Sequence, residues 1–549
     1  VVANNHILDY DTENFLETLD ILEDNSIKAV GGGKDIKAAR TPVVIEAGAT
    51  KIGLLAYSEF ASPHLYWSRS YPRTFLATND IPGVAPIAME EIREDVRKAT
   101  GVADVVMVAF HWGAEDTNVP LPFKVDQRRL AREVLDATGL HVLPGIIDTH
   151  VHLRDPGRTE REDWLSGTRA AAAGGITTIL EMPLAIPPVY SATLLRARAA
   201  HVQPRAVVDF ALYGAASGDN LDEIEAMAAS GAVAFKTFRT RAPAGREHEF
   251  TGICCPDAGQ MLRVMERTAR TGLLHAVHAE DQQILDAAEA AVRHAGRHDG
   301  RAHALARPEA AEVASVAQCI ALAEATGARL QIVHLSTGAA AAWVARAKDA
   351  GLPVTAETCA HYLTFTEDAL AQWGPFAKCN PPLRPLETQQ RLWEAVRSGV
   401  IDVLGTDHAP YLPEEKAPYV DDIWGAAAGL PGLEEFVPLL LSAVARGQLD
   451  LPRLVRLTSE NPARLFGLWP RKGALVPGAD ADVVLVDLQA EWVHDHRTLY
   501  TKARDVALLY DGLRLRGRPV ATVVRGRVVM RDGQVVGQPG WGRWVRPQT

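Results

Sequence analysis

The sequence is poor in cysteine and contains no long apolar run. The five cysteines among 549 residues are odd in number and unevenly spaced, which excludes a secreted disulfide framework and fits a reducing compartment. No stretch reaches the ~18 uninterrupted apolar residues that a membrane span needs, and no basic-then-apolar leader opens the chain. We therefore expect a cytoplasmic protein with no membrane partner.

The sequence also has fewer basic than acidic residues. The chain has 57 basic and 68 acidic residues, and the formal net charge of −11 argues against nucleic acid as the main partner. Hydrophobic residues make up 47% of the chain, which excludes a disordered or low-complexity protein. The composition is that of a large globular protein whose partner is a small molecule.

From residue 141 onward, short apolar runs alternate with Ala-rich helical stretches, which is the pattern of parallel βαβ units. Most of the helical stretches are followed by Gly, where a helix commonly ends. Eight such units over roughly 300 residues predict an α/β fold, the (β/α)8 TIM barrel. The eight predicted strands lie at 141–153, 176–183, 206–214, 232–238, 273–280, 329–337, 353–363 and 400–410.

Two further regions flank the predicted barrel. The tail contains the alternating runs ADVVLVDL, PVATVVRG and RVVMRDGQVVG, which predict a small β-sandwich domain. The front contains the strand candidates TPVVIEAG, KIGLLAYSEF and ADVVMVAFHWG among helices at 11–24, 88–100 and 126–137. We therefore divide the chain into an α/β segment at 1–135, a barrel at 138–450, and a C-terminal helix with the strands of the small domain at 451–549.

Ionisable side chains follow five of the eight predicted strands. Active sites of this fold lie at the C-terminal ends of the strands, so these side chains are expected to converge. The period of two in a strand places both imidazoles of a His-x-His pair on one face. Imidazole and carboxylate ligands without thiolate suit Zn²⁺, or Mn²⁺, Fe²⁺ or Co²⁺. The residues are His150, His152, Lys236, His278, His334 and Asp407.

Each of these residues alone has a plainer interpretation. A single strand histidine is more often a core residue with a hydrogen-bond partner than a ligand. Lys236 could extend to solvent, and Asp407 with His408 could form only a turn. The joint pattern favours a metal site, because the residues fall at the same end of different strands.

Ten stretches carry a resemblance to a known family: PGIIDTHVHLRDPG, GTRAAAAGGITT, AFKTF, VHAED, IVHLST, ETCAHYL, KCNPPLRP, GTDHAPY, SENPARLFGL and KGALVPGADADVVLVD. Through them the chain from about residue 138 to 549 resembles the cyclic-amide branch of the amidohydrolase superfamily, which includes dihydroorotase, allantoinase and hydantoinase. The resemblance implies a hydrolase that opens a cyclic amide. We also expect a homo-oligomer.

The resemblance implies a role for each ligand candidate. His150 and His152 would bind one divalent metal ion, and His278 and His334 a second. Lys236 would be carboxylated by CO₂ and bridge the two ions, which requires a neutral amine that burial favours. Asp407 would complete the first site and act as the catalytic base. Two ions can lower the pKa of a shared water and polarise the ring carbonyl.

The residues around the metal site point to two substrates. Arg154 resembles the dihydroorotase arginine that binds a carboxylate, and Asn380 fits the same role, although Arg154 could instead pair with Asp155. Leu184 after Met-Pro resembles allantoinase, and Tyr411 stands where dihydroorotases usually have histidine. We expect a dihydroorotase-like activity, with allantoinase or hydantoinase activity as the close alternative.

The front resembles another family. ANNHILDYD, AVGGGKDIKAAR and VAFHWGAED are similar to capsule or poly-γ-glutamate synthesis proteins of the CapA type, with Asn5, His6 and His111 at motif positions. That family resembles calcineurin-like metallophosphoesterases, so the resemblance implies a partial α/β metallophosphoesterase-like segment. Motifs expected before Val1 and after residue 135 are missing, so we interpret the segment as a truncated structural remnant. It replaces strands that relatives place before the barrel, which predicts an unpaired edge in the strands of 482–535 unless the front segment covers it. A non-catalytic scaffold and a capsule-synthesis protein are the alternatives from other classes.

Overall fold

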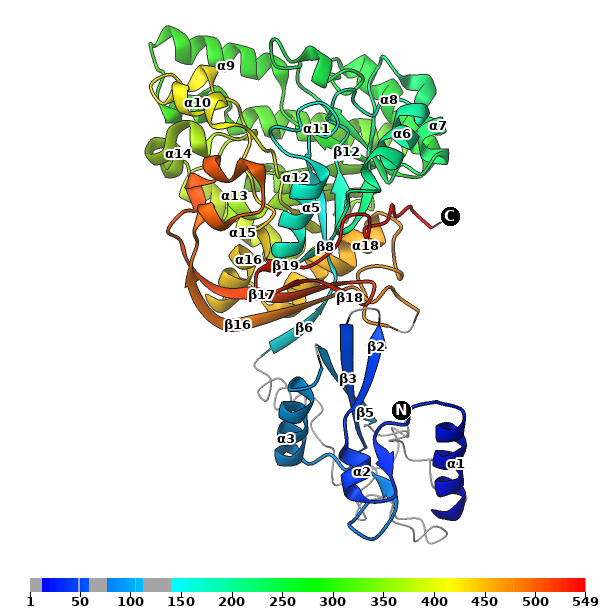
Figure 1. The fold of residues 1–549 in the computed structure, drawn as a ribbon. Coiled ribbons are helices and arrows are strands. Elements are labelled where there is room, and N and C mark those ends of the chain that lie inside the picture. The colour runs from blue at the N-terminus through cyan, green and yellow to red at the C-terminus, as the bar shows by residue number, and fades with distance from the viewer. Residues whose placement is uncertain are drawn as a thin grey trace. The chain divides into compact units, whose positions relative to one another are not determined.

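The computed structural model describes residues 12–47, 50–58, 77–103, 105–111, 140–476 and 478–548. Its contacts divide the chain into two compact units, residues 1–141 and 142–549 (Figure 1). Asn5 and His6 lie outside the described residues, as does the helix predicted at 126–137. Within these ranges, no helix is both long and apolar enough to cross a membrane.

The first unit is a small α/β structure. Its sheet has the order β2 (Val43–Ala47), β3 (Thr50–Ser58) and β5 (Val105–His111), with β2 antiparallel and β5 parallel to β3. The three strands coincide with the three predicted from the sequence. The helices are α1 (Thr12–Asp24), α2 (Ile36–Arg40) and α3 (Met89–Thr100), and a two-stranded pair joins β1 (Gly32–Gly33) to β4 (Gly83–Val84).

The alternation along β3 creates two small cores, one on each face of this sheet. Ala56 packs with Phe15 of α1, whereas Leu55 and Tyr57 pack in the cluster that contains Ile92 of α3. His111, which the resemblance places at a motif position, is the last residue of β5.

The second unit contains the predicted (β/α)8 barrel, which is confirmed. Each predicted run contains a strand, and the third strand is divided into β9 and β10 around Tyr213. A parallel bridge between Val151 and His408 closes the barrel between its first and eighth strands. The strands are β7 (Ile146–Val151), β8 (Ile176–Glu181), β9 (Asp209–Leu212), β10 (Gly214–Ala215), β11 (Ala234–Phe238), β12 (Leu274–His278), β13 (Arg329–Ile332), β14 (Val354–Cys359) and β15 (Val403–Gly405).

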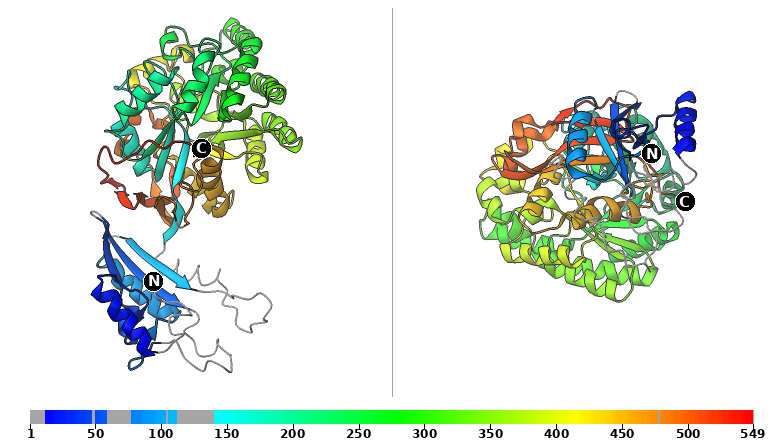
Figure 2. Two further views of the ribbon diagram at one scale, coloured as in Figure 1. Left: turned by 90° about the vertical axis from the view of Figure 1, so that its right-hand side faces the viewer. Right: turned by 90° about the horizontal axis from the view of Figure 1, so that it is seen from below.

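Helices surround these strands, as the view from below shows (Figure 2). The helices α8 and α11 end at Gly272 and Gly327, where φ values of 69° and 71° require a residue without a Cβ. The helices of this unit are α5 (Trp164–Ala173), α6 (Ala192–Val202), α7 (Ile224–Ala229), α8 (Ala258–Thr271), α9 (Gln282–His294), α10 (Gly300–Ala306), α11 (Glu309–Thr326), α12 (Gly338–Asp349), α13 (Ala360–Thr364), α14 (Asp368–Trp373), α15 (Leu386–Ser398), α16 (Phe436–Ala445), α17 (Leu451–Val455) and α18 (Asn461–Leu465).

A second sheet accompanies the barrel. Its order is β19 (Gln534–Val535), β18 (Arg527–Arg531), β17 (Arg514–Val524), β16 (Val483–Val493) and β6 (Leu140–Pro144). The pairs from β16 to β19 are antiparallel. The sequence predicted an unpaired edge in this sheet, but β6 lies beside β16. The segment that leads into the first barrel strand therefore covers that edge.

A buried ionic cluster ties the tail to the barrel. The ammonium group of Lys472 lies 2.5 Å from Asp209 of β9, 2.9 Å from Asp480 and 2.6 Å from Asp482. Asp209 also accepts a hydrogen bond from the backbone N–H of Arg543 at 2.8 Å. Because a buried charge is costly without a partner, these contacts hold strand, tail and small sheet together.

Candidate active site

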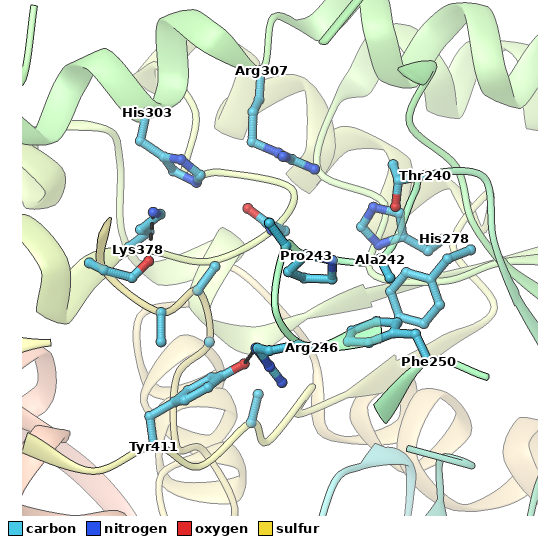
Figure 3. A pocket seen from close by; sticks show the side chains of 18 of the residues that line it. Thr240, Ala242, Pro243, Arg246, Phe250, His278, His303, Arg307, Lys378 and Tyr411 are labelled. Atoms are coloured by element: carbon cyan, nitrogen blue, oxygen red, sulfur yellow. Dashed lines mark hydrogen bonds between the residues drawn. The ribbon is translucent and has the colours of Figure 1, made fainter. Parts of the chain in front are cut away.

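A cavity of about 760 Å³ opens at the C-terminal ends of the barrel strands. Part of its lining is shown in Figure 3, where His278, Arg307, Lys378 and Tyr411 come from separate segments of the barrel. Of the residues predicted from the sequence, the lining contains His150, His152, Arg154, His278, His334, Asn380 and Asp407. Lys236 is fully buried on β11.

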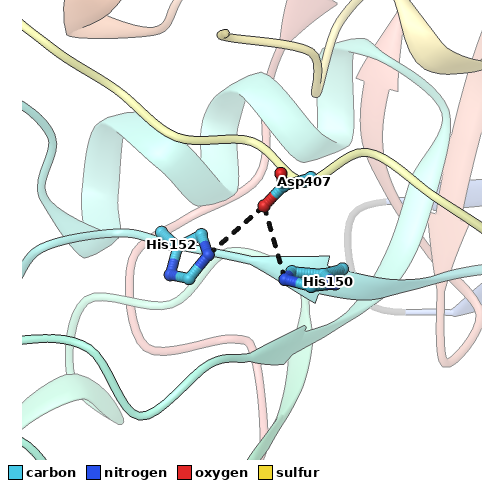
Figure 4. A group of neighbouring side chains, drawn as sticks. All are labelled: His150, His152 and Asp407. Carbon is cyan, nitrogen blue, oxygen red and sulfur yellow. Dashed lines mark ion pairs between the residues drawn. The ribbon is translucent and has the colours of Figure 1, made fainter. Parts of the chain in front are cut away.

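The first group consists of His150, His152 and Asp407 (Figure 4). One oxygen of Asp407, Oδ1, lies 3.3 Å from Nε2 of each histidine. Burial lowers the pKa of His152 to about 3, so this imidazole is neutral at pH 7. Burial opposes ionisation of Asp407, but the two histidines outweigh it and hold its pKa well below the usual range. A carboxylate facing a neutral imidazole is a donor set that suits a cation.

The second group consists of His278 and His334. Nδ1 of His278 lies 3.0 Å from Nε2 of His334, and burial lowers the pKa of both imidazoles. The ring centre of His334 is 5.2 Å from that of His150, so the two groups are neighbours. The structure thus brings together all four histidines that the sequence predicted as ligands.

Lys236 is the third component of the site. Its Nζ has no hydrogen-bond partner in the part of the chain that the structure describes. It lies 4.8 Å from the ring centre of Phe238, and that ring stacks on His278. Burial lowers the pKa of Lys236 from 10.5 to about 8, although the charges of Asp407 and Glu357 oppose the change. A measurable fraction of this amine is therefore neutral near pH 7.

Sequence reasoning missed two carboxylates that orient the histidines. Oε1 of Glu357 accepts a hydrogen bond from Nδ1 of His150 at 2.7 Å, and Oε2 of Glu280 accepts one from Nε2 of His278 at 2.8 Å. Each contact places the proton on the nitrogen that faces the carboxylate, which leaves the other nitrogen with its lone pair toward the site. Both residues lie inside quoted motifs, ETCAHYL and VHAED, but only the folded barrel pairs them with their histidines.

Three residues of the site have unusual backbone conformations. Arg154, His334 and Asp407 have φ values of 60°, 39° and 48°, a region that residues with a Cβ seldom occupy. Asp148 stabilises the turn at Asp407, because its carboxylate accepts bonds from the N–H of Thr406 at 3.0 Å and from its hydroxyl at 2.7 Å. The backbone strain lies where side chains must converge.

The two predicted substrate-binding residues line the same cavity. Arg154 is buried, and its Nε and Nη1 have no hydrogen-bond partner among the described residues; the same holds for Oδ1 of Asn380. The alternative partner of Arg154, Asp155, is instead 2.7 Å from Nε2 of His201. Both side chains therefore keep polar atoms available to a ligand.

The arrangement fits a metal centre. Nδ1 of His334 and Nζ of Lys236 are buried without a hydrogen-bond partner in the described ranges, which is costly unless another group satisfies them. Nitrogen and oxygen donors converge on one end of the barrel, and no cysteine is among them. Neutral imidazoles and an ionised carboxylate are the forms that bind metal.

Comparisons with known proteins agree with this geometry. The sequence model of the amidohydrolase family matches residues 141–529, and that of the bacterial capsule synthesis protein PGA_cap matches residues 1–161. Both resemblances expected from the motifs are confirmed. The two matches overlap at 141–161, where the structure places the first barrel strand.

Relatives align over most of their own length. An allantoinase of Rubrobacter xylanophilus is 41% identical over 423 residues, which is 76% of this chain and 90% of that protein. An L-hydantoinase of Paenarthrobacter aurescens is 35% identical over 420 residues, covering 76% and 89%. A solved L-hydantoinase (dihydropyrimidinase) from Arthrobacter aurescens matches with a TM-score of 0.72 at 34% identity, covering 74% and 89%. The chain therefore belongs to the amidohydrolase family, and within it is a metal-dependent cyclic amidohydrolase.

Proposed function

We propose that the barrel unit opens the ring of a cyclic ureide, with allantoin as its substrate. The observation that carries this choice is the 41% identity to an allantoinase across 90% of that protein's length. The cavity supports the choice, because five of the six ligand candidates line it beside polar side chains with donors and acceptors that have no partner among the described residues.

Two metal ions are part of this proposal. His150, His152 and Asp407 would hold one, and His278 and His334 the other. The ions, Zn²⁺ by preference and Mn²⁺, Fe²⁺ or Co²⁺ as alternatives, would supply Lewis acidity to the attacking water and to the ring carbonyl. The support is the convergence of two imidazoles on one carboxylate, with Asp407 3.3 Å from both His150 and His152.

Lys236 would join the site as a carbamate. Its neutral Nζ attacks the carbon of CO₂, a nitrogen–carbon bond forms, and one proton leaves, so the side chain changes from an amine to an anion that can bridge two cations. The pKa of about 8 supports this step, because the neutral amine is the reactive form. Its burial beside Phe238 excludes water that would compete for the amine.

Asp407 would move the proton. Its ionised carboxylate accepts a proton from water as the water oxygen bonds to the ring carbonyl carbon. It then gives that proton to the ring nitrogen as the carbon–nitrogen bond breaks. The products on the open chain are an N–H group and a carboxylic acid, which releases the remaining water proton to solvent and becomes a carboxylate. The unusual φ of 48° at Asp407 supports the role, since the turn directs this side chain toward His150 and His152.

Dihydroorotate is the second candidate substrate, and a specific observation favours it. Arg154 is a buried cation with two nitrogen atoms that lack a hydrogen-bond partner among the described residues, and a guanidinium binds a carboxylate in a bidentate manner. Dihydroorotate carries such a carboxylate, whereas allantoin carries a neutral ureido group.

A ring-opening assay with allantoin, hydantoin and dihydroorotate side by side tests the proposal. We expect the highest kcat/KM with allantoin and close to two metal ions per chain. A preference for dihydroorotate would replace allantoin with the second candidate. Absence of turnover on all three substrates, in protein that retains its metal, would overturn the proposed function.

A further inference from the structure

One tyrosine in the cavity is surrounded by guanidinium groups. Tyr411 is buried, and its ring centre lies 5.6 Å from the guanidinium carbon of Arg154, 4.9 Å from that of Arg161 and 5.4 Å from that of Arg246. Its hydroxyl oxygen accepts a hydrogen bond from Nη1 of Arg246 at 2.8 Å, as Figure 3 shows. The ring is therefore held by Arg246 and faces the other cations.

Two of the three arginines have carboxylate partners. Arg246 binds Glu249 through Nε at 3.0 Å and through Nη2 at 2.5 Å. Arg161 donates through Nε to Glu415 at 2.9 Å and lies 3.5 Å from Glu249. These carboxylates use the in-plane N–H groups of Arg161 and Arg246, so neither arginine is free to bind a ligand in the same way.

Arg154 differs from both. No ion pair joins it to a carboxylate in the described ranges, and its Nε and Nη1 are buried without a hydrogen-bond partner. A carboxylate partner would compensate its charge but would also occupy its in-plane N–H groups. The face of an aromatic ring attracts the cation without using those groups. Tyr411 therefore stabilises Arg154 while its donors remain available.

The surroundings of Tyr411 favour this role. Burial opposes ionisation of the phenol, but the charges of Arg246, Arg154 and Arg161 outweigh it and lower its pKa below the usual value. The direction of this shift agrees with the contacts, which place three guanidinium groups around one phenol ring.

We propose that Tyr411 is a positioning residue that holds the guanidinium of Arg154 by its ring face, so that the free N–H edge binds an acceptor oxygen of the substrate. The acceptor would be a planar carbonyl or carboxylate group next to the ring that is opened. The inference rests on the proposed function for the identity of that substrate. It predicts that Tyr411 controls substrate affinity rather than the chemical step.

The experiment compares Tyr411→Leu and Tyr411→Phe with the wild-type, metal-loaded protein. Steady-state rates with allantoin give kcat and KM, and calorimetry with allantoate, the ring-opened product, gives a Kd that needs no turnover. Tyr500→Leu is the matched control, because the ring of Tyr500 lies 4.9 Å from the Arg169 guanidinium and does not line the cavity.

We expect Tyr411→Leu to raise KM and the allantoate Kd about tenfold while kcat changes less than about threefold and the metal content is kept. Tyr411→Phe keeps the ring face, so its allantoate Kd should rise only about threefold. Tyr500→Leu should change neither constant. If Tyr411→Leu does not fold, Arg154→Lys, which loses the planar N–H edge, should raise the same Kd.

The results separate this inference from the function it rests on. Unchanged KM and Kd in Tyr411→Leu, or a loss confined to kcat, would overturn the positioning role even if allantoin is the substrate. A wild-type protein that binds allantoate but opens no ring would overturn the proposed function, and a weaker Kd in Tyr411→Leu would still support the positioning role.

Discussion

Replacing Glu357 with Gln tests whether the buried carboxylate prepares His150 to bind metal. Glu357 accepts hydrogen bonds at 2.7 Å from Nδ1 of His150 and at 2.5 Å from the hydroxyl of Thr149. Glutamine keeps the shape but offers only one acceptor oxygen. Because the Thr149 hydroxyl can accept as well as donate, the amide oxygen can still face His150, and the histidine keeps its tautomer. What is lost is the negative charge on the bond.

Loss of a carboxylate that orients a metal-binding histidine lowers metal affinity about 10- to 100-fold, or about 1.4 to 2.7 kcal/mol. Because the tautomer of His150 is retained, we expect Glu357→Gln to lower the metal affinity by about tenfold, the smaller of these losses. If the amide nitrogen faces His150 instead, Nε2 becomes the protonated atom and the loss approaches the upper value. Competition with a chelator of known Zn²⁺ affinity measures the change, and kcat at saturating Zn²⁺ shows whether catalysis returns.

Glu312→Gln is the control for this experiment. Glu312 is equally buried and accepts two bonds from Ser336, the N–H at 2.8 Å and the hydroxyl at 3.1 Å, but contacts none of the four histidines. We expect its Zn²⁺ affinity to match the wild type. An unchanged affinity in Glu357→Gln, or an equal loss in both variants, would refute the orienting role of Glu357.

Four further changes have defined outcomes. Asp407→Asn keeps an oxygen ligand but accepts no proton, so kcat should fall by about 10²- to 10⁴-fold with metal largely bound; unchanged turnover would exclude its role as base. Lys236→Ala should reduce bound metal below one ion per chain, and added formate should restore part of it; full metal content without formate would exclude the bridging role. Lys472→Met leaves the buried Asp482 without a cationic partner, while Asp209 keeps Arg525 and Asp480 keeps Arg471. The variant should lower the free energy of unfolding in urea by about 3–5 kcal/mol, whereas Lys502→Met, which breaks a more exposed pair with an aspartate, should lower it by about 0–1 kcal/mol. Burial alone would raise the pKa of Glu249, but its hydrogen bonds and ion pair with Arg246 outweigh burial and lower the pKa from 4.5 to about 2. The pair therefore stabilises the fold fully above about pH 4.5, and this stabilisation is lost as the pH falls toward 2. Glu249→Gln should therefore weaken the acid dependence of stability, and an unchanged dependence in denaturation curves at several pH values would contradict this.

The barrel was predictable because its signals are local. Buried parallel strands require short apolar runs, and the helices between them require Ala-rich stretches that end at Gly. The ligand candidates could be found from local sequence in the same way. The C-terminal ends of all the barrel strands lie at one end of the barrel, so His150 and His334 could be assigned to one site without knowing the distance between them.

Partners from different strands were not predictable in this way. Glu357 and His150 are 207 residues apart, and only closure of the barrel brings Nδ1 and Oε1 within 2.7 Å. The same holds for Tyr411 and Arg154, whose contact depends on where two loops meet above the strands. No periodic pattern in the sequence around Glu357 or Tyr411 indicates which distant residue each side chain contacts.

The edge of the small sheet shows the same division. The sequence indicated that strands before the barrel were missing, but not that 140–144 would form β6 beside β16. A five-residue run has too weak a pattern to specify its neighbour, because its backbone groups can pair with any open strand edge.

The sequence by itself determined the barrel, the six ligand candidates and the family, because strand period and strand-end position act within short segments. Only the tertiary structure decided which carboxylates orient His150 and His278, which aromatic ring holds Arg154, and which charges Lys472 joins. Hydrogen bonds, ion pairs and cation–π contacts require atoms that lie within about 3 to 6 Å of one another. These atoms come from segments remote in the sequence, and only the closed barrel brings them that close.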